Sequence, residues 1–153
     1  MPYFPKRRVV VPVDFSESSA ESLVTARKLV ASASDLHVIH ILLPLDYMAP
    51  GVFLESHSEQ TQKEATQKQC AEFVRNHGAE GAQIVAKHGD PGLGVTDYAA
   101  SIQAELIVIA SHGYHGLKRL LLGSVAERVI RHADCPVLVL RRRDSQPHAA
   151  SNP

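Results

Sequence analysis

The sequence predicts an α/β fold, an open five-stranded parallel sheet with helices on both faces. Two observations lead to this fold. Five short apolar runs, rich in β-branched residues, alternate along the chain with four segments of helical periodicity. Within each run the apolar residues are consecutive rather than alternate, which is typical of strands buried on both faces. Strict alternation of strand and helix favours right-handed crossovers and parallel strand pairing.

The apolar runs place the strands at residues 8–13, 36–43, 83–88, 106–110 and 136–140. The run at 83–88 alternates between apolar and polar residues more than the others do, so we expect it at an edge of the sheet. Pro12 has no N–H to give to a ladder, so the first strand should end or bend there.

Helical periodicity predicts helices at residues 18–31, 58–77, 93–103 and 124–132. Ser18 with Glu21, and Ser124 with Glu127, have the spacing of a capping box at a helix start. Gly78 is suited to end the second helix. Residues 44–57 contain two prolines and a glycine and are expected to form a long loop.

Composition bounds the class of protein. The 153 residues suit one domain, expected over residues 1–141, with a disordered tail at 142–153. Sixteen acidic and sixteen basic side chains give no net charge, and so no support for binding nucleic acid or a membrane surface. Two separated cysteines suit a reducing compartment. The start of the chain lacks an apolar signal region, and no apolar run reaches the ~20 residues of a membrane span, so we expect a cytoplasmic protein.

Three strand ends are expected to meet at one edge of the sheet. In open parallel sheets, ligands bind beyond the carboxyl ends of the strands, where the strand order reverses. The residues that follow the first, second and fourth strands are Asp14, 42–43 and 111–116. One crevice can collect all of them, and an aspartate at this place suits a nucleotide site. Taken alone, Asp14 is better explained as a helix cap or turn residue.

The stretch from Leu106 to Val125 has the composition of a phosphate-binding segment. A buried strand leads into a loop with the pattern Ala110-x2-Gly113-x9-Gly123-Ser124, and Ser124 begins a helix. Glycines let a backbone approach a ligand closely, and a helix N-terminus favours an anion. The spacing alone is equally compatible with a simple turn and a serine that only caps its helix. Neither Gly-x4-Gly-Lys-Ser/Thr nor a Gly-x-Gly-x-x-Gly after the first strand occurs, which disfavours P-loop and dinucleotide-binding proteins.

The segments ASHGYHGLKRLLLGSVAERVIRHADCPVLVLR, VVVPVDFSESS and HGDPG resemble the universal stress protein family, and the similarity extends over residues 6–141. The resemblance implies a Rossmann-like fold of the adenine nucleotide alpha hydrolase type. Nucleotide-binding members of the family have Gly-x2-Gly-x9-Gly-Ser/Thr, which this chain matches at Gly113, Gly123 and Ser124. It departs from the pattern at Ala110, and alanine resists positive φ.

The resemblance also implies a role for each position of the site. Asp14 would meet the ribose or a metal bound to the phosphates, and Ile41 would offer a backbone group to adenine. The other positions form three groups by their expected neighbour. They are Pro12 and Val13 near the base; Ala110, His112 and Gly113 beside the ribose and phosphates; and Gly123, Ser124 and Val125 around the phosphates.

The resemblance therefore predicts a cytoplasmic stress-response protein that binds ATP, or AMP or ADP, with Mg²⁺ or Mn²⁺. It implies a homodimer in which Val137–Leu140 pairs with its mate, and an apolar edge strand would otherwise promote aggregation. The regulatory protein partner is unknown. Two alternatives stay open. One is an interaction module of the same fold that binds no nucleotide, and the other is a slow ATP hydrolase, although no general base is evident. Lys118 and Arg119 could neutralise phosphate or simply face solvent.

Overall fold

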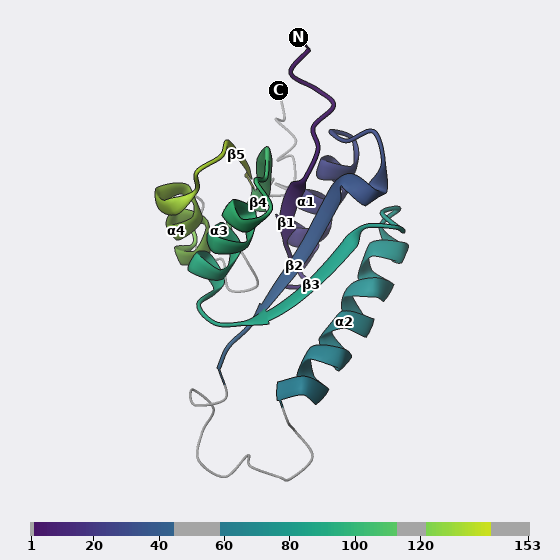
Figure 1. Cartoon of the computed structure of the whole chain (residues 1–153), viewed down its shortest axis with the longest axis vertical. Helices are drawn as coiled ribbons and strands as arrows, with labels where there is room; N and C mark the ends of the chain where they lie inside the picture. The colour runs from purple at the N-terminus through teal and green to yellow at the C-terminus, as the bar shows by residue number, and fades with distance from the viewer. Residues whose placement is uncertain (1, 45–58, 113–121, 142–153) are drawn as a thin grey trace, which may run out of the picture.

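The computed structural model describes residues 2–44, 59–112 and 122–141, and its strands form one five-stranded sheet in the order β3-β2-β1-β4-β5 (Figure 1). Every strand pair is parallel, which confirms the predicted fold class. The strands are β1 (Val9–Pro12), β2 (Leu36–Leu42), β3 (Gln83–His88), β4 (Leu106–Ala110) and β5 (Val137–Leu140). β3 lies at an edge as expected, and β5 lies at the other.

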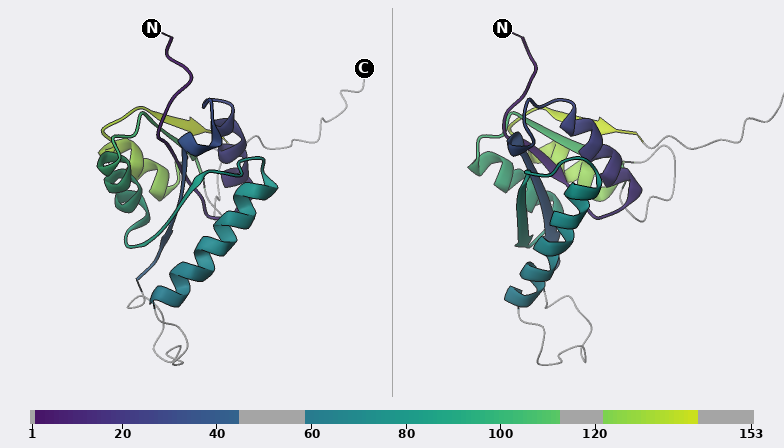
Figure 2. Two further views of the ribbon diagram at one scale, coloured as in Figure 1. Left: turned by 45° about the vertical axis from the view of Figure 1, so that its right-hand side comes forward. Right: turned by 90° about the vertical axis from the view of Figure 1, so that its right-hand side faces the viewer.

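Two pairs of helices cover the two faces of the sheet (Figure 2). The helices are α1 (Glu17–Arg27), α2 (Glu59–Asn76), α3 (Pro91–Ser101) and α4 (Ser124–His132), with a short 3-10 turn η1 (Ala33–Asp35). Side chains of a strand alternate between the faces, so each strand contributes to two cores. Val9 and Val11 of β1 pack with residues of α1 and α2, whereas Val10 packs with residues of α3 and α4.

The predicted caps of two helices are wrong, because another residue caps each helix, although α4 begins at Ser124 as predicted. The side chain of Ser16 accepts a hydrogen bond from the Ser19 N–H, so α1 begins at Glu17 and Ser18 lies inside the helix. Gly123 is the N-cap of α4, and no side chain caps that helix. The capping boxes predicted at Ser18 and Ser124 are therefore absent. α3 begins two residues earlier than expected because Asp90 caps it and Pro91 occupies its first position.

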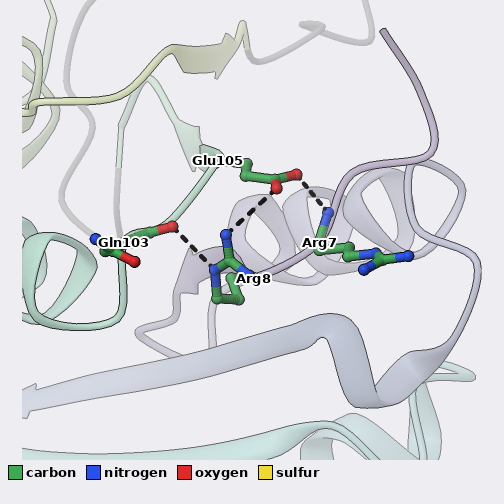
Figure 3. Close-up of polar contacts among 4 residues, drawn as sticks. All are labelled: Arg7, Arg8, Gln103 and Glu105. Carbon is green, nitrogen blue, oxygen red and sulfur yellow. Dashed lines mark hydrogen bonds and ion pairs between the residues drawn. The ribbon is translucent and has the colours of Figure 1, made fainter. Parts of the chain in front are cut away.

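The seam between β1 and β4 is closed at one end only. Within the described residues the two strands pair at Val9 with Leu106 and at Val10 with Ile107, which are near their amino ends. Polar contacts close this end (Figure 3): Glu105 accepts from the Arg7 N–H at 2.8 Å and from the Arg8 guanidinium at 3.4 Å. The Arg8 Nε also donates to the Gln103 carbonyl at 3.0 Å. The opposite, carboxyl end of the seam has no such closure among the described residues.

None of the helices in the described ranges is long and apolar enough to cross a membrane. The loop predicted at 44–57 lies outside those ranges except for its first residue, and the predicted tail at 142–153 lies wholly outside them.

α2 and α3 end in the same way but with different residues. After α2, the Ala79 N–H donates to the Val74 carbonyl and Gly78 has φ +72°. After α3, the Ala104 N–H donates to the Ala99 carbonyl and Gln103 has φ +52°. Both ends are Schellman motifs, in which a left-handed residue follows the helix, and glycine is the residue best suited to that place.

Gln103→Gly should therefore stabilise the protein. Glycine removes the steric cost of the left-handed conformation and keeps the backbone carbonyl to which Arg8 donates. We expect the free energy of unfolding, measured by urea denaturation, to rise by about 1 kcal/mol. The matched change Gly78→Gln should lower it by a similar amount. A loss of stability in Gln103→Gly would contradict the prediction.

Candidate functional site

A cavity of about 660 Å³ opens at the carboxyl ends of the strands, where β1 lies between β2 and β4. This volume is within the usual range of small-molecule sites. The ends of the three strands form its floor and sides, and the first turns of α1, α3 and α4 contribute the rest of the wall. The cavity is therefore at the switch point, where the predicted crevice was expected.

Every predicted site residue that the structure describes lies in the wall of this cavity. These residues are Pro12, Val13, Asp14, Ile41, Ala110, His112, Gly123, Ser124 and Val125. Gly113, and with it Lys118 and Arg119, lies outside the described residues. The structure thus brings together residues from three strands and a helix. Their contact with a ligand stays a prediction.

The end of β2 presents backbone groups to the cavity. The Ile39 carbonyl accepts from the Val13 N–H at 2.9 Å, so this residue faces β1, and the Leu42 carbonyl accepts from the Gly89 N–H at 2.9 Å, so that residue faces the β3 side. Successive residues of a strand face opposite sides. Ile41 therefore turns its N–H and C=O toward β1, but β1 has already ended at Pro12. A hydrogen-bond donor and an acceptor, side by side, face the cavity.

The N-terminus of α4 is open to an anion. The first helical hydrogen bond runs from the Glu127 N–H to the Gly123 carbonyl, so the N–H groups of Ser124, Val125 and Ala126 have no helical partner. Among the described residues, no side chain caps this helix. The Gly123 N–H donates to the Ser111 carbonyl at 2.7 Å, and a Cβ on Gly123 would lie 3.0 Å from that oxygen. Glycine thus allows the helix to begin close against the end of β4.

The N-terminus of α3 also borders the cavity, but its donors are occupied. The Asp90 side chain accepts from the Leu93 N–H at 2.9 Å and forms an ion pair with Arg128 of α4. The hydrogen bond from Leu93 lowers the pKa of Asp90 below its usual value, and the Arg128 guanidinium acts in the same direction. An ionised carboxylate therefore caps α3 at neutral pH, and it disfavours a second anion there.

Asp14 has both of the roles that the sequence left open. Its Oδ1 accepts from the Ser16 N–H at 3.0 Å, which forms an Asx turn before α1, and it also accepts from the Ser16 hydroxyl. The same residue lines the cavity. The turn therefore holds the carboxylate at the cavity wall.

Two histidines in the wall have a defined hydrogen bond on one ring nitrogen. The His40 Nδ1 lies 2.7 Å from the Val13 carbonyl, so it donates, and in the neutral ring Nε2 is then an acceptor. The His112 Nδ1 lies 3.2 Å from the hydroxyl of the buried Ser111. The buried His112 Nε2 has no hydrogen-bond partner among the described residues, so it is a candidate contact for a ligand.

Ala110 does not need the conformational freedom of glycine. It is the last residue of β4, pairs with Leu140 of β5, and is not among the described non-glycine residues with positive φ. The departure from the family pattern at this position therefore costs the backbone nothing. It adds one methyl group to the cavity wall.

The sequence did not identify several residues of the wall. They are Ser16, Ser19, Ile39, His40, Pro91, Val95, Ile109 and Ala126, whereas Leu42, Leu43 and Ser111 follow predicted strands and were expected in the crevice. Most of them neighbour a predicted residue along the chain. Pro91 and Val95 do not, and the only signal for them was the sharp turn at 89–92, which lies at the same edge of the sheet.

In the described part of the chain, no three His, Cys, Asp or Glu side chains lie close enough together to form a metal site. Asp14 is the one Asp, Glu, Lys or Arg residue in the described wall of the cavity. A cation here would therefore need ligands from the bound molecule as well as from Asp14.

The chain belongs to the universal stress protein family, since residues 6–141 match the sequence profile of that family. A universal stress protein of Methanocaldococcus jannaschii, MJ0531, is 32% identical and aligns with 89% of this chain and 82% of its own length. The universal stress protein YxiE of Bacillus subtilis is 28% identical, over 88% of this chain and 98% of its own.

Solved structures share the fold. The hypothetical protein MJ0577 superposes with a TM-score of 0.74 at 23% identity, covering 92% of this chain and 99% of its own. A universal stress protein in complex with cAMP superposes with a TM-score of 0.65 at 22% identity, covering 91% of this chain and 99% of its own. The universal stress protein from Archaeoglobus fulgidus in complex with dAMP superposes with a TM-score of 0.58 at 23% identity, covering 90% of this chain and 100% of its own.

Proposed function

We propose that this protein is a cytoplasmic regulator of the stress response that binds an adenine nucleotide, ATP or AMP or ADP, in the cavity between β1 and β4. One observation supports it most. The cavity has a free donor and acceptor on β2 at one side, and an uncapped helix N-terminus, that of α4, at the other. The proposed role in the stress response rests on membership of the universal stress protein family.

The Ile41 backbone favours adenine over guanine. Adenine offers a donor, its amino group, next to an acceptor, N1, and these match a C=O next to an N–H. Guanine has the opposite order on that edge, so its carbonyl and N1–H would face like groups. Ile39, Val95 and Ile109 give the cavity an apolar floor that suits a base.

The phosphates would lie at α4. Its three N–H groups and the Ser124 hydroxyl are donors, and the helix dipole favours negative charge there. His112 adds a nitrogen on the β4 side. Asp14, between base and phosphates, would meet the ribose or a divalent cation that also binds phosphate oxygens. The two relatives solved with cAMP and dAMP hold adenine nucleotides, which supports the same class of ligand here.

The two other hypotheses make different predictions. An interaction module without nucleotide would release no nucleotide on denaturation and would keep its partner when Gly123→Val and Ser124→Ala are combined. A hydrolase would turn over ATP steadily and lose that activity in Asp14→Ala. The Asx turn of Asp14 occupies one carboxylate oxygen, and this favours binding over proton abstraction.

The purified protein should release an adenine nucleotide on denaturation, or bind AMP when measured by calorimetry. GMP should bind about 10-fold to 100-fold more weakly, because the reversed edge costs about 1–3 kcal/mol. Inosine monophosphate is the matched control, since it shares the edge of guanine without the extra amino group, and it should be rejected like GMP. If the supernatant holds no nucleotide and neither AMP nor ATP gives heat, the proposal fails.

ATP should bind more tightly with Mg²⁺ than without it, by about tenfold, since Asp14 opposes a metal-free polyphosphate and attracts a bridging cation. Asp14→Asn is a conservative test, because asparagine also forms Asx turns. We expect this variant to bind metal-free ATP more tightly than the wild type and to gain little from Mg²⁺. If Mg²⁺ raised the ATP affinity of both proteins equally, Asp14 would not be a ligand of the cation.

We further propose that the protein is a homodimer through β5, whose outer edge is available. The Leu140 carbonyl accepts from the Ser111 N–H and the Pro136 carbonyl from the Ile107 N–H, so even-numbered residues face β4. Val137 and Val139 therefore face outward. All four residues of β5 are only half-buried, which suits a strand that gains cover on pairing.

Val139→Pro should convert the dimer to a monomer and leave the fold intact, because it removes an outward N–H and spares the ladder with β4. Light scattering after size-exclusion chromatography measures the mass, and circular dichroism checks the fold. Leu138→Pro is the control, since it removes an inward N–H and should destabilise the sheet itself. A dimeric Val139→Pro protein would exclude this interface.

A further inference from the structure

α3 lies unusually close to the end of β2. A Cβ on Gly94 of α3 would lie 2.9 Å from Cδ1 and 3.2 Å from Cγ1 of Ile41. Protein Cβ atoms do not approach other heavy atoms as closely as 2.9 Å, so any larger residue at this position must displace Ile41 or α3. The side chain of Ile41 thus fills the space that glycine leaves on the helix.

Backbone geometry does not explain this glycine. Gly94 lies inside α3, its N–H donates to the Asp90 carbonyl at 2.8 Å as in any helix, and its φ is not positive. Alanine is favoured over glycine at such a position. The glycine is therefore explained by the space it leaves for Ile41.

The end of β2 is held weakly against displacement. β1 ends at Pro12, which is opposite Ile39, so beyond that point only β3 pairs with β2. Pro91 and Val95, which flank Gly94 on α3, line the cavity together with Ile41. A methyl group on Gly94 would therefore shift the Ile41 side chain, which lines the cavity, or the strand end that carries it.

We infer that Gly94 is a positioning residue for the base: by receiving the Ile41 side chain, it holds the Ile41 backbone N–H and C=O where an adenine edge can meet them. This inference rests on the proposed nucleotide function and names a residue that does not itself touch the nucleotide. Gly94 acts through Ile41, and its effect should appear in base recognition rather than in stability.

The test is a double-mutant cycle with Gly94→Ala, Ile41→Val and the two combined. Valine lacks Cδ1, the atom nearest to the added methyl group, and keeps the backbone groups. We expect Gly94→Ala to weaken AMP binding roughly tenfold and to reduce the preference for AMP over GMP. Its melting temperature should stay close to that of the wild type, because the helix propensity of alanine offsets part of the cost of displacing Ile41. Ile41→Val is the reference for the double variant: adding Gly94→Ala to it should change the AMP affinity by less than about twofold, because the atom nearest to the added methyl group is gone.

Two results would overturn the inference. One is an AMP affinity and an AMP-to-GMP preference in Gly94→Ala that equal those of the wild type. The other is a double variant that folds but whose AMP affinity lies as far below that of Ile41→Val as the affinity of Gly94→Ala lies below that of the wild type. If Gly94→Ala does not fold, the double variant is compared with Ile41→Val, and weaker AMP binding by the double variant again overturns it. Failure of the proposed function is distinguishable, because the wild type itself would then bind no AMP.

Discussion

The rest of the structure depends on one constraint, the separation of β1 and β4 toward their carboxyl ends. The chain moves outward from β1 through β2 to β3, then crosses back over β1 to form β4 and β5. Right-handed crossovers put α1 and α2 on one face and α3 and α4 on the other, so the connections leave the β1–β4 seam in opposite directions. Arg8, Gln103 and Glu105 close the seam at its amino end, and the cavity opens at the other.

Around this opening, the same hydrogen bonds stabilise the fold and shape the cavity. Gly123 donates to Ser111 and so seats α4 against β4, and this contact leaves the next N–H groups facing the cavity. Asp14 forms the turn that starts α1, and the turn places its carboxylate in the wall. Each residue thus has a structural role that is compatible with the role proposed for it in the site. The spacing of residues alone could not have decided between them.

The sequence predicted the strands well because consecutive apolar residues fit only a strand covered on both faces. It failed at Ser18 and Ser124 because a helix can be capped by any of several nearby residues. The path of the chain decides that choice, and periodicity does not encode the path. Pro91 and Val95 were missed for a related reason, since nothing in the spacing of α3 says which neighbours it meets after its crossover. Whether the Ile41 N–H and C=O are left without a strand partner likewise depends on where β1 stops.

The two sides of the cavity differ in their hydrogen-bonding groups, which its residue composition does not reveal. α3 and α4 both begin at its rim, after similar sequences of glycine and a small polar residue. Asp90 occupies donors of α3 and adds a negative charge, whereas Gly123 leaves the donors of α4 open. An anionic ligand therefore meets open donors at one helix end and occupied donors at the other. In the proposed function Ile41, next to α3, would face the end of the ligand that has no charge. A molecule with an uncharged hydrogen-bonding base and a charged tail fits this field in one orientation, whereas a symmetric dianion would leave either Ile41 or α4 unmatched.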